Sequence, residues 1–323
     1  MDAGVFVLGM HRSGTSAVTR LISLLGLHTP PEADLVQPTE KNPKGYWESE
    51  SLVAFNERLL WAIDCDIGCP VVLEPGWEND ARLDRLRADA RAVVREIFPV
   101  APWVWKDPRH CLAFAFWRSV LEVRPVVVLV NRNPLEITAS ALRLRREQGK
   151  IYALALWERY LRQALGQASG LPVLVTDYSG VLSAPLDWCA RAHAFLVAAG
   201  VPAHEPAEDE VLAFIDTTLR HATFDQGDLL SDPDLSDAQR ALFSALNEME
   251  GPHASFSAHP LPAETPTTEA LLRERRRALE LKRQLERERR SSWRWRLRSS
   301  RYAAPARPIY SGGRRLLKAL QGR

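Results

Sequence analysis

The chain has 323 residues, of which 46% are hydrophobic, so it can bury the core of one large α/β domain or of two smaller domains. No apolar run reaches the ~18 residues of a membrane span, and an acid near the N-terminus replaces the basic start of a signal peptide. The four cysteines form no Cys-x-x-Cys pair, which disfavours zinc and disulfides and indicates free thiols. We therefore expect a cytoplasmic protein.

The formal net charge of +2 conceals an asymmetry along the chain. From Glu264 onward there are 18 Lys and Arg against 6 Asp and Glu, a net charge of +12, whereas the preceding part has 24 against 34, a net charge of −10. Four prolines between 252 and 266 mark a linker. We predict a globular domain over 1–250, a Pro-rich linker over 251–267 and a basic C-terminal extension over 268–323.

Strand and helix patterns alternate along the domain, beginning with a short apolar run, a glycine loop and a helical pattern. This alternation predicts a three-layer α/β domain of the P-loop type with a mostly parallel sheet. Residues 27–47 form a long loop, and such loops are often functional. Strands are predicted at 5–8, 103–105, 125–130 and 173–175, and helices at 12–25, 49–63, 80–98, 110–121, 134–147, 151–168, 185–199, 208–215, 236–249 and 268–291.

The first loop has the layout of a phosphate-binding loop, in which backbone N–H groups and a helix N-terminus favour an anion. Gly9 and Gly14 are separated by four residues, nearly the spacing of nucleoside-triphosphatase loops. The lysine that those loops place next is Thr15 here, and Arg12 supplies a cation inside the loop instead. A tight turn without a ligand is the alternative interpretation.

Basic or polar residues follow the other predicted strands as well. Lys106 begins the segment Lys-Asp-Pro-Arg, Arg132 follows the most apolar strand, and Tyr178 follows the last strand. Ser140 comes eight residues after Arg132, so its hydroxyl should point back towards the loop that carries Arg132. An arginine with a hydroxyl suits a phosphate monoester. Ligands of this kind bind at the carboxyl ends of parallel strands.

Together these motifs resemble those of sulfotransferases, which use 3′-phosphoadenosine 5′-phosphosulfate (PAPS). The segment 12–16, Arg-Ser-Gly-Thr-Ser, resembles their 5′-phosphosulfate loop, and the Arg132–Ser140 pair resembles their 3′-phosphate loop. Lys106-Asp-Pro resembles a segment of tyrosylprotein-type and related bacterial and carbohydrate enzymes, whose lysine contacts the sulfuryl group. Tyr178 matches a later family segment, although the acidic pair that usually follows is Ser-Gly here. The resemblance covers about residues 4–200.

The resemblance implies transfer of a sulfuryl group from PAPS to an acceptor hydroxyl without a metal. Arg12 and Lys106 would stabilise the transferring group, because catalysis of such a displacement consists of positioning and electrostatic stabilisation. Arg132 and Ser140 would hold the 3′-phosphate. The remaining donor-binding residues would be Ser13, Gly14, Thr15 and Ser16.

The acceptor hydroxyl requires a general base, and several residues are candidates. Glu48 follows the long loop at the place where related enzymes have a catalytic glutamate, but it could equally be an acid of a helix first turn. Glu40 and His110 are competitors. Arg109 could bind substrate, but pairing with an acid is the favoured interpretation. Trp47 could line an acceptor or adenine site, or belong to the core.

The C-terminal extension mixes arginines with Trp293, Trp295 and Tyr302. This composition suits an anionic membrane surface, and a solvated charged helix is the alternative. Nucleic acid is not expected, because the domain is acidic. Leucines in this extension recur at spacings of seven residues, the pattern of a coiled coil, so a short coiled coil and a homodimer are alternatives that the sequence leaves open. The extension also loosely resembles the tail of some bacterial glycan-assembly glycosyltransferases, which favours a saccharide or lipid-linked glycan as acceptor.

Two other functions stay open from the sequence. One is a nucleoside-triphosphate-dependent kinase or hydrolase with a P-loop, against which Thr15 argues. The other is a non-catalytic binding protein in glycan assembly.

Overall fold

The computed structural model describes residues 2–40, 42–144, 149–216 and 222–299, with side chains omitted at 144 and 289–299. Contacts divide the chain into two units, Met1–Arg273 and Glu274–Arg323. The described part of the second unit is the continuation of one helix. The aromatic side chains predicted to contact a membrane surface, at 293, 295 and 302, are not among the side chains that the structure describes.

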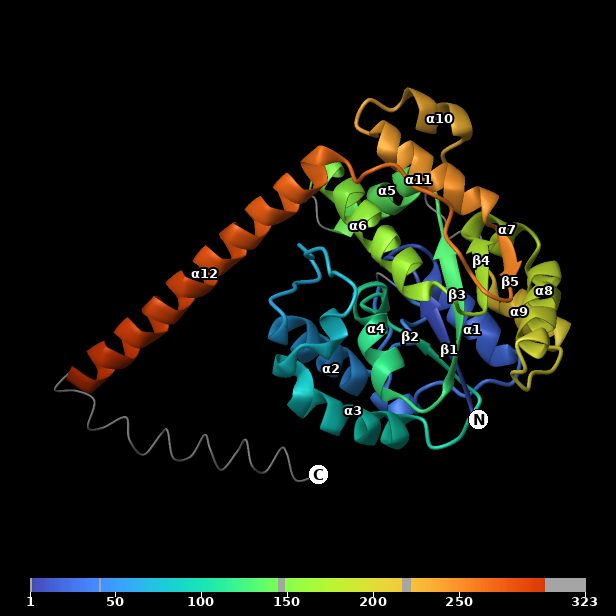
Figure 1. Cartoon of the computed structure of the whole chain (residues 1–323), viewed down its shortest axis with the longest axis horizontal. Coiled ribbons are helices and arrows are strands. Elements are labelled where there is room, and N and C mark those ends of the chain that lie inside the picture. Colours follow the sequence, from blue (N-terminus) through green and yellow to red (C-terminus); the bar gives the residue numbers. More distant parts are fainter. Residues whose placement is uncertain (1, 41, 145–148, 217–221, 300–323) are drawn as a thin grey trace. The chain divides into compact units, whose positions relative to one another are not determined.

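The first unit is built on a five-stranded sheet, and Figure 1 shows its strands side by side in the order β2-β1-β3-β4-β5. The pairs β1·β2, β1·β3 and β3·β4 are parallel, and only β4·β5 is antiparallel. This confirms the predicted α/β class with a mostly parallel sheet. The strands are β1 (Ala3–Leu8), β2 (Trp103–Lys106), β3 (Arg124–Asn131), β4 (Val173–Asp177) and β5 (Gly251–His253).

Both faces of the sheet are covered, as unbroken apolar strands require. Successive side chains of β1 alternate between the faces. Val5 and Val7 belong to the core cluster that contains residues of α1 and α8. Phe6 packs on the opposite face, with its ring 5.7 Å from that of Trp105 and 4.8 Å from that of Phe114 in α4. The sheet is therefore the middle of three layers.

The helices match the predicted ones closely in the apolar parts of the chain, where periodicity is strong. Helices α7 and α10 are present in the structure but were not predicted. The last three residues of the predicted helix 134–147 lie outside the described residues. The α-helices are α1 (Thr15–Leu24), α2 (Glu50–Ala62), α3 (Asp84–Ile97), α4 (His110–Val120), α5 (Pro134–Leu144), α6 (Lys150–Ala168), α7 (Tyr178–Ser183), α8 (Pro185–Ala198), α9 (Glu208–Phe214), α10 (Gln226–Ser231), α11 (Asp237–Glu248) and α12 (Pro266–Ser299).

Two differences from the predicted elements have local causes. Helix α7 begins directly after β4, because the carboxylate of Asp177 accepts from the amides of Ser179 at 2.9 Å and Gly180 at 3.2 Å. Strand β5 occupies the first residues of the segment predicted as a linker. Its Pro252 is tolerated because β5 lies at the edge of the sheet and needs no second ladder partner.

The parallel topology brings four predicted positions to one edge of the sheet. Val7 pairs with Lys106 across β1 and β2, and Leu8 pairs with Leu129 across β1 and β3. Asn131, which precedes Arg132, pairs with Asp177, which precedes Tyr178. The carboxyl ends of β1 to β4 therefore meet, as expected from the sequence. None of the described helices is long and apolar enough to cross a membrane.

Candidate functional site

The loop between β1 and α1 is a tight turn with unusual backbone angles. Ser13 donates through its amide and its hydroxyl to the carbonyl of Met10, at 3.1 and 2.6 Å. Arg12 has a φ of 72° and Gly14 a φ of 93°, both in the left-handed region. A Cβ at Gly14 would overlap the ring of Tyr178, so only glycine fits there. A strained non-glycine residue such as Arg12 is typical of ligand sites.

A cluster of two arginines lies at this loop. The Nε of Arg12 donates to the hydroxyl of Ser140 at 2.9 Å, and Nη1 of Arg132 donates to the carbonyl of Arg12 at 2.9 Å. The guanidinium of Arg132 lies 4.9 Å from the ring centre of Tyr178 and pairs with Glu136 at 2.9 Å. The structure thus brings the predicted 5′-phosphate and 3′-phosphate residues together.

The charge of Arg12 is poorly compensated. Burial and the neighbouring charge of Arg132 lower the pKa of Arg12, although an arginine stays protonated at neutral pH. Among the described residues, no carboxylate forms an ion pair with Arg12. The N-cap of α1 is Gly14, which has no side chain to accept from the first helical amides. A half-buried cation beside a helix N-terminus favours binding of an anion.

Lys106 and Glu48 form a direct ion pair at the same sheet edge. Lys106 is the last residue of β2 and only 2% of its side chain is exposed, while 13% of the Glu48 side chain is exposed. Glu48 directly precedes Ser49, the N-cap of α2, whose hydroxyl accepts from the amide of Leu52 at 3.1 Å. Two of the three residues predicted to be catalytic, Lys106 and Glu48, are therefore partners of each other.

A buried network supports the turn after Lys106. Asp107 accepts from Asn56 at 2.9 Å and pairs with Arg109 at 3.0 Å, and Arg109 also pairs with Glu57 at 2.7 Å. Burial alone would raise the pKa of Asp107, but Arg109, His110 and the hydrogen bonds hold it below its usual value. Arg109 therefore pairs with acids, as favoured from the sequence. The role of Asn56 was not predicted, because α2 and β2 are distant in the chain.

His110 does not fit the role of general base. Its side chain is fully buried, with its ring 4.4 Å from that of Trp105 and 5.4 Å from that of Phe6. Burial lowers the pKa of His110 to about 4, and the charges of Arg109 and Lys106 act in the same direction while Asp107 opposes them. Neither ring nitrogen has a hydrogen-bond partner among the described residues. The prediction of His110 as a competing base is wrong because α4 begins at His110 and its first turn places this side chain in the core.

A cavity of about 720 Å³ collects almost all of the predicted site residues. Ser13 does not line it, since that side chain is buried against Met10, and neither does Trp47, whose Nε1 donates to the carbonyl of Lys44 at 3.1 Å. Glu40 does line the cavity, so its candidacy as base stands. The predicted residues that line it are Arg12, Gly14, Thr15, Ser16, Glu40, Glu48, Lys106, Arg109, Arg132, Ser140 and Tyr178.

Other lining residues were not singled out from the sequence. The ring of Tyr160 lies 5.8 Å from that of His11, and Ser16 donates to the carbonyl of Tyr46 at 3.1 Å, which ties the long loop to the phosphate loop. The aromatic content of α6 was visible in the sequence, but its packing partners decide which face meets the cavity. The lining residues that were not singled out include Lys44, Tyr46, Glu136, Arg143, Tyr152, Leu156, Tyr160 and Phe214.

Comparisons with known proteins give only distant similarity. No family model matches the sequence, and no curated protein matches it. The structure is similar to the sulfotransferase domain of the Synechococcus PCC 7002 olefin synthase, with 17% identity, 84% of this chain and 94% of that chain covered, and a TM-score of 0.40. It is also similar to the sulfotransferase domain of the curacin biosynthetic pathway, with 15% identity, 84% and 98% covered, and a TM-score of 0.41. Similarity at this level does not establish what the chain does.

Proposed function

We propose that the chain is a sulfotransferase that moves a sulfuryl group from PAPS to an acceptor hydroxyl. The observation that carries the proposal is the Arg12–Arg132–Ser140 cluster, in which Arg12 has no carboxylate partner among the described residues. Such a cluster, next to a helix N-terminus with no side-chain cap, suits a ligand with more than one phosphate-type group.

The residues present fit the donor. The amides of the phosphate loop, together with Thr15 and Ser16, would hold the 5′-phosphate. Thr15 and Ser16 are the first residues of α1, and the N-terminus of a helix attracts negative charge. Arg132 and Ser140 would hold the 3′-phosphate. The ring of Tyr178 packs against the guanidinium of Arg132 and against Gly14, so this side chain fixes the position of Arg132 relative to the phosphate loop. The bound donor supplies an activated sulfuryl group whose leaving group is a phosphate oxygen.

The chain's own residues would supply charge and a proton acceptor. Lys106 and Arg12 would stabilise the negative charge that develops as the new oxygen–sulfur bond forms at the acceptor and the bond to the phosphate oxygen breaks. Glu48 would accept the proton of the acceptor hydroxyl. In the structure Lys106 holds Glu48. If the ammonium group of Lys106 contacts a sulfuryl oxygen of the bound donor instead of Glu48, the carboxylate of Glu48 becomes available to accept the proton.

The experiment that tests the proposal is calorimetric titration with adenosine 3′,5′-bisphosphate, run beside ATP with magnesium. We expect tight, metal-independent binding of the bisphosphate and weak binding of ATP. The opposite preference would reject the sulfotransferase assignment in favour of a P-loop kinase or hydrolase. Tight bisphosphate binding without transfer of labelled sulfur to any acceptor tested would favour a non-catalytic binding protein.

Replacement of Arg132 by alanine should separate the two phosphate subsites. We expect Arg132→Ala to weaken binding of adenosine 3′,5′-bisphosphate about 10- to 100-fold, the range of one charged hydrogen bond of ~1.5–3 kcal/mol. Binding of adenosine 5′-phosphate should change little, because it lacks the 3′-phosphate. Calorimetry with both ligands measures this difference, and an equal loss for both would contradict the assignment of Arg132.

We further propose a saccharide or lipid-linked glycan as acceptor, supported by the resemblance of the tail, and contact of the basic extension with an anionic membrane surface, supported by its charge. Transfer of labelled sulfur to a panel of saccharides tests the first. Cosedimentation of the full chain with anionic and with neutral vesicles tests the second, and equal binding to both would reject it.

A further inference from the structure

One wall of the cavity is a loop without regular secondary structure that α6 holds in place. The cavity is lined by Ile67 and Gly68 of this loop. Tyr160 of α6 donates through its hydroxyl to the carbonyl of Ile67 at 2.8 Å, and Tyr152 donates to the carbonyl of Gly68. These tyrosine hydroxyls are therefore engaged by the loop rather than directed at a ligand.

Arg159 completes this attachment from the same helix. Its Nη1 donates to the carbonyl of Pro70 at 2.7 Å, and only 1% of its side chain is exposed. Three carbonyls within four residues of the loop thus accept from α6. The ring of Tyr160 also packs against that of His11, the neighbour of Arg12, which places this wall beside the phosphate loop.

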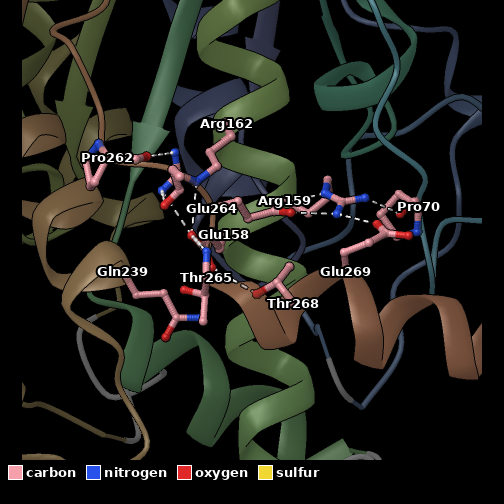
Figure 2. Close-up of polar contacts among 11 residues, drawn as sticks. Pro70, Glu158, Arg159, Arg162, Gln239, Pro262, Glu264, Thr265, Thr268 and Glu269 are labelled. Atoms are coloured by element: carbon pink, nitrogen blue, oxygen red, sulfur yellow. Dashed lines mark hydrogen bonds and ion pairs between the residues drawn. The ribbon is translucent and has the colours of Figure 1, made fainter.

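The remaining donors of Arg159 are held by two carboxylates from the C-terminal end of the first unit (Figure 2). Glu264 accepts from Nε and Nη2 at 2.7 Å each, and Glu269 in the first turn of α12 accepts from Nη2 at 2.8 Å. A bidentate pair fixes the plane of the guanidinium, and with it the direction of the bond to Pro70.

The adjacent Glu158 and Arg162 hold the same C-terminal segment but do not reach the loop (Figure 2). Glu158 accepts from the amide of Thr265 and the hydroxyl of Thr268, at 3.0 Å each. Arg162 donates to Glu158 at 3.0 Å and to the carbonyl of Pro262 at 2.8 Å. The chain therefore offers an arginine one turn away that anchors the segment without contacting the cavity wall.

We propose that Arg159 is a positioning residue that, clamped by Glu264 and Glu269, sets the loop of residues 67–70, whose Ile67 and Gly68 line the cavity, and thereby the fit of the acceptor. The assignment of this wall to the acceptor rests on the proposed sulfuryl transfer. It is supported by the origin of the donor residues: Arg132 follows β3, and Ser140 and Tyr178 belong to α5 and α7, so none of these residues comes from this loop.

The test compares Arg159→Gln with Arg162→Gln as the matched control. The one hydrogen bond of Arg159 that reaches the loop, to the carbonyl of Pro70, comes from a charged donor, and its loss corresponds to about tenfold at the lower end of the range for such bonds. We therefore expect amides of residues 67–72 to exchange their hydrogens about tenfold faster in Arg159→Gln, and at the wild-type rate in Arg162→Gln. Adenosine 3′,5′-bisphosphate should bind both variants as it binds the wild type.

The kinetic measurement uses PAPS as donor and 4-nitrophenyl β-D-glucopyranoside as the probe acceptor. We expect Arg159→Gln to raise KM for the probe about tenfold with kcat within about threefold, because the wall affects acceptor binding more than the chemical step. Arg162→Gln should leave both parameters near wild type. Equal behaviour of the two variants in exchange and kinetics would overturn the proposal.

A second variant keeps the proposal testable if Arg159→Gln does not fold. Glu264→Gln retains the segment and a hydrogen-bond acceptor but weakens the clamp, and we expect a smaller change in the same exchange rates and in KM. Wild-type exchange and KM in Glu264→Gln would reject the clamp. If the wild-type chain transfers no sulfuryl group, the proposed function fails, and faster exchange at 67–72 in Arg159→Gln alone still supports the positioning role.

Discussion

Replacement of Lys106 by alanine is expected to lower kcat for sulfuryl transfer about 100- to 1000-fold, the cost of removing one preorganised group that stabilises developing charge. Lys106 is buried at the end of β2, next to the loop that carries Arg12. Its ammonium group is therefore desolvated, and its charge acts more strongly there than in water. The Kd of adenosine 3′,5′-bisphosphate should change by less than about threefold, because this ligand has no sulfuryl group.

A second variant separates loss of catalysis from damage to the site. Lys106→Ala leaves Glu48 without its partner, and an unpaired, mostly buried carboxylate could by itself disturb the site. The double variant Lys106→Ala with Glu48→Gln removes that charge. We expect the double variant to be at least as slow as Lys106→Ala in single-turnover measurements, because it also lacks the proposed base. Recovery of kcat in the double variant would show that Lys106 serves only to neutralise Glu48 and that Glu48 is not the base.

The positions at the carboxyl ends of the strands could be predicted from the sequence because they depend on local patterns. An apolar run of strand length, ended by a glycine or a basic residue and followed by a helix, defines where a strand stops. Parallel strands then bring these ends to one edge, whatever their order in the sheet. Gly9, Lys106, Arg132 and Tyr178 meet for this reason.

The partners of these residues could not be predicted, because they are set by packing between distant segments. Glu48 meets Lys106 across 58 residues of chain, and Asn56 meets Asp107 across 51. Arg159 meets Glu264 and Pro70 only because α6 packs between them. In each case the sequence shows a charge or an amide without showing what faces it. Such long-range pairs decide which candidates are available for chemistry.

His110 illustrates the same limit with a consequence that can be measured. In the sequence it is a histidine next to a motif whose lysine is predicted to be catalytic, which makes it a candidate base. In the structure it packs between Trp105 and Phe6 with no hydrogen-bond partner for either ring nitrogen among the described residues. A histidine in such surroundings affects the pH dependence of stability rather than the pH dependence of catalysis.

We expect the free energy of unfolding to fall by ~3 kcal/mol through His110 alone as the pH drops from 7 to 4. The pKa of His110 is about 4 in the folded chain, against an ordinary value of 6.5 that applies when the chain is unfolded. Between these two values the unfolded chain binds a proton that the folded chain does not. Acid therefore favours the unfolded chain throughout this window, and above pH 6.5 the effect vanishes.

The measurement is urea unfolding of the wild type and of His110→Phe at several pH values between 4 and 8. Phenylalanine preserves the aromatic packing against Trp105 and cannot bind a proton, so the difference in stability between the two proteins isolates His110. Carboxylates distant from His110 contribute to both proteins and cancel in the difference. Asp107, whose pKa the charge of His110 helps to lower, cancels only while His110 is neutral in the folded chain, above about pH 4. We expect the stability of His110→Phe relative to wild type to rise steadily as the pH falls from 6.5 to 4. A constant difference would mean that the folded chain protonates His110 as readily as the unfolded chain does, and that water or a charged partner reaches the ring.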